Sequence, residues 1–75
     1  MNEPQTRYKI DRDKLTAAML KAGISTFKEL ANRAGVMRMT LYFACRRGCR
    51  RSTLMKIAET LNVNAVDLLE DAVVK

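Results

Sequence analysis

The sequence predicts an all-α fold, a single small domain of five short helices. Apolar residues recur at the spacing of three and four positions that places side chains on one face of a helix. Capping residues and glycines separate these segments, and the sequence shows no strand pairs or internal repeats. The chain has 75 residues, of which 48% are hydrophobic, so one compact core can form without disulfides or a metal.

Residues 1–9 are expected to form a flexible or extended N-terminal arm, followed by one domain over residues 10–75. The first six residues contain the only proline and are otherwise mostly polar, as is common at a loose chain end. Tyr8 and Ile10 then alternate with basic residues, a pattern that favours an extended segment. We expect this segment to cover an edge of the core; pairing with another subunit is the alternative.

A first helix is expected over residues 12–22, with Asp11 as its N-cap. A second helix is expected between Thr26 and Gly35. Thr26 and Glu29 have the spacing of a capping box, in which the Thr26 hydroxyl accepts from the Glu29 N–H and the Glu29 side chain reaches back. The residues expected on the core-facing sides of these two helices are Leu15, Ala18, Met19, Ala22, Leu30, Ala31 and Ala34.

The third helix is expected to run from Arg38 to position 45 or 46, and a basic loop is expected over residues 46–51. Ser52 is the expected N-cap of the fourth helix, and Asn64 that of the fifth, which has Asp67 at the capping-box position. The residues expected to face the core in these helices are Leu41, Ala44, Cys45, Leu54, Ile57, Ala58, Leu61, Val66, Leu69 and Val73.

Positive charge is concentrated in the middle of the chain, whose net charge is +6. Residues 1–27 hold five basic and three acidic residues (+2), residues 28–56 hold eight and one (+7), and residues 57–75 hold one and four (−3). This asymmetry favours a polyanionic partner, with nucleic acid preferred over an anionic membrane surface. No apolar run approaches the roughly 20 residues that span a bilayer, and no signal-peptide pattern is present, so a cytoplasmic location is expected.

Candidates for metal or redox chemistry are limited to Cys45 and Cys49, because histidine is absent. Two thiols cannot supply the four ligands of a typical zinc site, and a disulfide between them would close a very small loop. We therefore expect both cysteines to act as small apolar side chains near the core, and we expect no cofactor. No carboxylate pair lies beside a nucleophile or a glycine-rich phosphate loop, so enzymatic activity is not expected.

Residues 27–46 have the spacing of a helix-turn-helix. Ala31 supplies a small residue where two helices would cross at about 90–120°, and Gly35 suits the short turn between them. The residues expected to anchor both helices to the core are Leu30, Val36, Leu41 and Ala44. With the basic middle of the chain, this motif favours DNA binding.

Residues 30–36, 40–42 and 52–63 resemble the Cro/phage-repressor (XRE-type) helix-turn-helix family, and the resemblance extends over about residues 10–69. It implies the five-helix, lambda-repressor-like fold. It also implies a homodimer that binds double-stranded DNA at a pseudo-palindromic operator, usually to repress transcription, with half-sites about 34 Å apart. The first candidate for the dimer surface is the segment 67–74. The alternative function is an antitoxin-like or accessory protein-interaction module that binds DNA secondarily.

The resemblance implies that the second helix of the motif enters the major groove. Arg38 is suited to paired hydrogen bonds with a guanine edge, or else to a phosphate. Tyr42 can donate to a base or a phosphate, while Met39 and Phe43 suit thymine methyl groups or a protein partner. The residues expected to bind phosphates are Lys28, Arg46, Arg47, Arg50 and Arg51; for the arginine run, a solvated loop without a ligand is the alternative.

Two positions depart from the family pattern. Relatives usually have glutamine where this chain has Phe27, and serine or threonine where it has Met37. The loop before Ser52 is also shorter than in many relatives and lacks their common proline. Met37 cannot cap the reading helix through its side chain.

Overall fold

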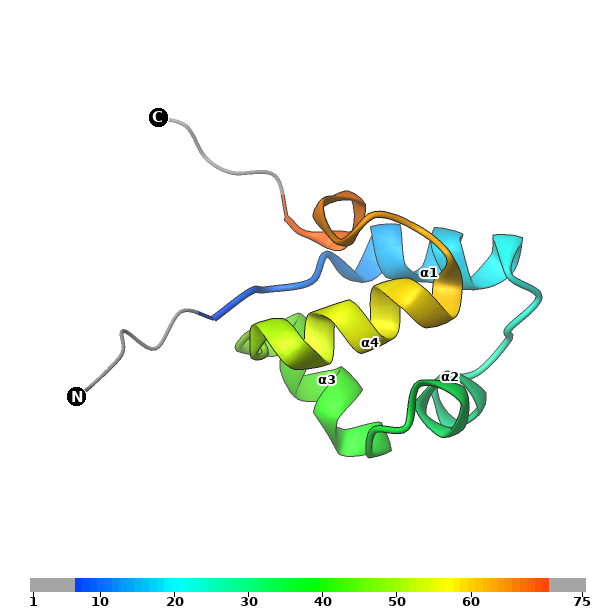
Figure 1. The fold of residues 1–75 in the computed structure, drawn as a ribbon, viewed down its shortest axis with the longest axis horizontal. Helices are drawn as coiled ribbons and strands as arrows, with labels where there is room; N and C mark the ends of the chain where they lie inside the picture. The colour runs from blue at the N-terminus through cyan, green and yellow to red at the C-terminus, as the bar shows by residue number, and fades with distance from the viewer. Residues whose placement is uncertain (1–6, 71–75) are drawn as a thin grey trace.

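The computed structural model describes residues 7–70, and over this range the fold is all-helical, as the sequence predicts (Figure 1). Four α-helices are followed by one short 3-10 helix. In chain order these are α1 (Arg12–Lys21), α2 (Phe27–Ala34), α3 (Arg38–Arg46), α4 (Arg51–Leu61) and η1 (Ala65–Leu68). The prediction of a fifth α-helix is therefore wrong, because one turn of 3-10 helix stands in its place.

α1 begins where the sequence indicates. The Asp11 carboxylate accepts from the backbone N–H groups of Asp13 and Lys14, at 2.9 and 3.2 Å, and so satisfies two donors that the first helical turn leaves free. The helix ends at Lys21, and Ala22 is exposed rather than core-facing. Ala22 is the C-cap, after which the chain turns and places Ile24, 1% exposed, in the core instead.

α2 forms half of the predicted capping box. The Thr26 Oγ1 accepts from the Glu29 N–H at 3.1 Å. The Glu29 carboxylate does not return to Thr26 but accepts from the Arg33 guanidinium at 3.0 Å, one helical turn further along. Gly35 ends the helix in the left-handed conformation (φ 74°), which glycine adopts at little cost.

α4 begins two residues before the position that the sequence indicates. Its N-cap is Arg50, which makes no side-chain capping bond, so the expectation that Ser52 caps this helix is wrong. The cause is tertiary: the Cys49 N–H and carbonyl pair with the carbonyl and N–H of Tyr8, both at 2.9 Å. This extended pairing fixes the chain up to Cys49, and the helix starts as soon as it ends.

η1 also differs from its prediction. The Asn64 side chain makes no capping bond, Val66 is 67% exposed, and Leu68 is the buried residue. Leu69 is half-buried against the core, while Val73 lies outside the described residues. The helix stops after one turn because Leu69 is extended and forms an antiparallel bridge with Ile10.

The segment that precedes α1 lies extended across the edge of the core. Ile10 is fully buried, and its N–H donates to the Ala44 carbonyl at 3.0 Å. The Asp11 N–H donates to the Leu68 carbonyl at 2.8 Å. The prediction that this segment covers the core is thus confirmed, while the boundary between arm and domain at residue 10 stays a prediction.

Each helix contributes at least one large side chain to the core. Its largest fully buried members are Ile10, Leu15, Ile24, Leu30, Leu41, Ile57 and Leu68. α2 packs against α3 and α4, and η1 packs against α1 and α4, as the ribbon in Figure 1 shows. Within residues 7–70 no helix has the length and apolar character to cross a membrane.

Candidate nucleic-acid interface

The α2–turn–α3 unit is fixed to the core by its small and apolar residues. Ala31 is buried, and its carbonyl accepts from the N–H groups of Gly35 and Val36, at 2.9 and 3.0 Å. Leu41 and Ala44 are fully buried, and Val36 packs partly buried against the core. One face of α3 is thereby committed to the interior, and its opposite face is presented to solvent.

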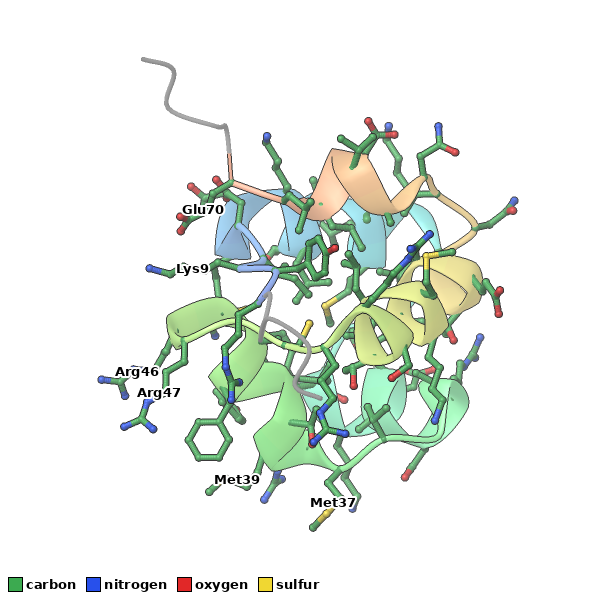
Figure 2. The ribbon with its side chains drawn as sticks, turned by 60° about the vertical axis from the view of Figure 1, so that its left-hand side comes forward. Lys9, Met37, Met39, Arg46, Arg47 and Glu70 are labelled. Carbon is green, nitrogen blue, oxygen red and sulfur yellow. The ribbon has the colours of Figure 1, made fainter. Side chains whose placement is uncertain are left out.

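The exposed face of α3 carries the four residues that the sequence suggests as base readers: Arg38, Met39, Tyr42 and Phe43. Met39 is 57% exposed and Phe43 48%. Met37 precedes them as the N-cap, 71% exposed and without a side-chain capping bond. Figure 2 shows Met37 and Met39 projecting outward at the same end of the molecule.

The five residues expected to bind phosphates are all exposed, and they come from three helices and one loop: Lys28, Arg46, Arg47, Arg50 and Arg51. Lys28 lies in the first turn of α2. Arg46 ends α3, and Arg47 follows as its C-cap; in Figure 2 both point away from the body. Arg50 is the N-cap of α4 and Arg51 its first residue, so the basic loop is confined to residues 47–50. Of these five, Arg46, Arg47 and Arg50 line hollows together with Phe43, on the exposed face of α3.

A shallow hollow of about 210 Å³ lies beside Phe43, between the N-terminal segment, α3 and α4. Arg7 and Arg50 line it together with the hydroxyl-bearing Thr40 and Thr53. Sequence reasoning did not single out Arg7, because only the pairing of Tyr8 with Cys49 brings it to this loop. Gly48 allows that approach: a Cβ at Gly48 would lie 2.9 Å from the Arg7 Cβ.

Phe27 occupies the first position of α2, and its ring packs against Tyr42. The two ring centroids are 4.9 Å apart, with the planes inclined at 57°. The Arg12 guanidinium lies over both rings, 4.8 Å from the Phe27 centroid and 5.8 Å from that of Tyr42. Sequence reasoning did not single out Arg12 either, because its approach depends on how α1 packs beside the motif.

The two cysteines differ in burial. Cys49 belongs to the core and Cys45 is half-buried beside it. Burial raises the pKa of both thiols, and the charges of Arg12 near Cys45 and Arg7 near Cys49 act in the opposite direction. Both thiols are therefore uncharged at neutral pH, consistent with the expected role as small apolar side chains. Across residues 7–70 no three His, Cys, Asp or Glu side chains form a group that could hold a metal ion.

Comparison with known proteins agrees with this geometry. A family model described as the Cro/C1-type helix-turn-helix DNA-binding domain matches residues 14–72. No curated protein and no solved structure matches the chain. The match spans the motif, α4 and η1, and it confirms the resemblance to Cro and phage repressors. The chain belongs to the Cro/C1-type helix-turn-helix family of DNA-binding domains.

Proposed function

We propose that the protein is a sequence-specific transcriptional regulator, a dimeric repressor that inserts α3 into the major groove of a pseudo-palindromic operator. The observation that carries this proposal is the exposed face of α3, where Arg46, Arg47 and Arg50 lie beside Phe43. The buried face of the same helix is fixed by Leu41 and Ala44, so the exposed side chains are held on a rigid element. Rigid presentation favours a reading surface, because base recognition requires side chains in fixed register.

Within this proposal, Arg38 is the principal reader. It is the first residue of α3 and is exposed, and its guanidinium can donate two parallel hydrogen bonds to a guanine edge. Met39 and Phe43 contact thymine methyl groups, and the Tyr42 hydroxyl donates to a base or a phosphate. The reading surface is more apolar than polar, which favours operators with thymines at the contacted positions.

Phosphate contacts would supply most of the affinity. The cations proposed for them are Lys28, Arg46, Arg47, Arg50 and Arg51. Two helix N-termini add to them, because neither Met37 nor Arg50 caps its helix with a side chain. The backbone N–H groups there remain available to phosphate oxygens.

Selection of bound sites from random duplex DNA tests specificity and dimer formation together. We expect two inverted half-sites whose centres lie about 34 Å apart, one turn of the duplex. A gel-shift series from about 50 to 200 mM salt should show affinity falling steeply, since each phosphate contact adds about 0.9 to the log–log slope. A slope near zero, with no preference over competitor DNA, would contradict the proposal.

The exposed apolar side chains favour a second candidate, an antitoxin-like or accessory module that grips another protein. Met37, Met39 and Phe43 leave much of their apolar surface in water, and such surface commonly marks an interface. Substituting Met39 and Phe43 by serine separates the two candidates. Loss of sequence preference on selected DNA supports the regulator, and unchanged DNA binding supports the protein-interaction module.

A further inference from the structure

Arg12 lies outside the helix-turn-helix, yet its guanidinium rests on two aromatic rings of the motif. Its Cζ is 4.8 Å from the Phe27 centroid and 5.8 Å from the Tyr42 centroid. We propose that Arg12 is a further DNA contact, a phosphate-binding residue on one flank of α3 that Phe27 and Tyr42 hold in place. The inference rests on the proposed function and adds a residue that neither the motif nor the charge pattern indicates.

The position of Arg12 brings its charge to the exposed face of α3. Tyr42 lies on that face, 39% exposed, so an anion that reaches Tyr42 also comes within reach of a guanidinium beside its ring. The Cys45 thiol, three residues after Tyr42 in α3, agrees with this placement. Burial raises the pKa of this thiol, and the positive charge of Arg12 lowers it. The Arg12 guanidinium therefore lies near the Tyr42 ring, on the exposed face of α3.

The stacked arrangement leaves the hydrogen-bonding groups of Arg12 free. A guanidinium that lies on an aromatic face keeps its N–H groups in its own plane, where they can point to an anion. Two other cations of the described chain are engaged by carboxylates: Arg33 pairs with Glu29 at 3.0 Å, and Lys9 with Glu70 at 3.7 Å. Within residues 7–70, Arg12 forms no such ion pair, and its nearest fixed partners are the rings.

A cation at this position carries an electrostatic cost, which its contact with the two rings has to offset. Arg12 is the first residue of α1, where the positive end of the helix dipole disfavours a positive side chain. An apolar side chain could cover Phe27 and Tyr42 without that cost. The charge is explained if an anion approaches from outside, because a phosphate would then face both Arg12 and the N-terminus of the helix.

Two further cations, Arg7 and Arg50, lie near Phe43 on α3. Phe43 follows Tyr42 and is turned about 100° around the helix from it, and it borders the hollow that Arg7 and Arg50 line. Cations thus lie on both sides of the exposed face of α3. A helix in the major groove, about 12 Å wide, has a phosphate backbone on each side, and Arg12 supplies the contact on the side of Phe27.

A salt series on purified full-length protein tests the inference, with R12A compared with K21A. Lys21 is exposed at the other end of the same helix and lines a groove with Val63 and Leu68, away from α3. Both variants lose one positive charge. We expect R12A to weaken binding to selected and random duplexes by the same factor and to reduce the log–log salt slope by about 0.9. K21A should retain the wild-type slope, and R12K should retain most of it.

Phe27→Leu tests the supporting role of the ring, because it leaves the net charge unchanged. In the F27L background the R12A substitution should cost less affinity than in the wild type, which a double-mutant cycle measures. Equal slopes for R12A, K21A and wild type, at temperatures where circular dichroism shows all three folded, would overturn the inference alone. Absence of salt-dependent DNA binding by the wild type would instead overturn the proposed function.

Discussion

Arg38 and Arg50 carry the same charge, but they have different roles in the proposed complex. Arg38 begins α3, whereas Arg50 precedes α4 as its N-cap. A base contact and a phosphate contact have different signatures, because only the first depends on the sequence of the duplex. The two residues therefore offer a direct comparison.

Arg38→Ala is expected to weaken binding to the preferred site by about 1–3 kcal/mol and to relax the preference at one base pair. Arg50→Ala is expected to weaken binding to all duplexes by a similar factor and to reduce the salt slope by about one. Titrations against the selected site and its single-base variants measure both effects. If the two variants behave alike on every duplex, Arg38 reads no base.

At Gly48, adding a single methyl group is expected to destabilise the fold, because the N-terminal segment lies close to it. Its φ of 104° is unfavourable for other residues, and an added Cβ would lie 2.9 Å from the Arg7 Cβ and 3.4 Å from the Tyr8 backbone. We expect Gly48→Ala to destabilise the fold by about 1–3 kcal/mol more than Gly23→Ala. Gly23 is the matched control, because it has a similar positive φ of 77° but open space around it. If the Gly48→Ala and Gly23→Ala variants had equal free energies of unfolding in urea, the N-terminal segment would have to move aside at no cost.

Sequence reasoning identified the exposed residues of α3 but missed the two arginines that the fold brings to them. Arg38, Met39, Tyr42 and Phe43 follow from helical periodicity within one segment. Arg7 and Arg12 reach the same region only through contacts with residues far along the chain, at Cys49 and Phe27. A local pattern contains no information on such pairings, so these positions could not have been singled out from one sequence.

Among the helices, α3 has an N-terminus that a single substitution can improve. Met37 has the extended backbone of an N-cap (φ −80°, ψ 149°) but no side-chain capping bond, and it is 71% exposed. We expect Met37→Thr to stabilise the protein by about 1 kcal/mol, because the hydroxyl can accept from an N–H of the first turn. The control is Met39→Thr, an exposed position inside α3, which should stabilise nothing. Chemical denaturation measures both, and equal effects would contradict the capping explanation.

Whether the ends of a helix were predicted correctly depended on the interactions that fix them. Local side chains set the start of α1 and α2, through Asp11 and Thr26, and both starts were predicted correctly. The start of α4 and the single turn of η1 are set by extended pairings with Tyr8 and Ile10 instead. Serine and asparagine are good capping residues in general, but here the tertiary pairings override them.

Over the whole molecule, η1 closes the core from the C-terminal side. Leu68 is 1% exposed, whereas Val66 in the same turn is 67% exposed. Leu68→Ala should cost about 2–5 kcal/mol through the cavity that it leaves, while Val66→Ala should change stability by less than about 0.5 kcal/mol. A domain of this size loses about 4–8 °C in Tm per kcal/mol, so thermal melts distinguish the two variants. Similar melts would mean that η1 is not part of the cooperative fold.

The fold class could be predicted from the sequence because several independent features of the sequence indicate it. Helical periodicity in the four α-helices, the small Ala31 and the turn at Gly35 all indicate the same architecture. Which residues of η1 face the core depends on one bridge, between Ile10 and Leu69. A single pairing of this kind produces no periodic pattern in the sequence. The family was therefore identified correctly although Val66 was wrongly expected to face the core and the burial of Leu68 was not predicted.

The pairing of the first and last described segments has a practical consequence. The Lys9 carbonyl accepts from the Glu70 N–H at 3.2 Å, and the two side chains form an ion pair at 3.7 Å, side by side in Figure 2. The two ends of the described chain, at Lys9 and Glu70, therefore lie next to each other. Such a unit can be inserted into a surface loop of a host protein without stretching the loop, which would let the host's conformation control when α3 is presented.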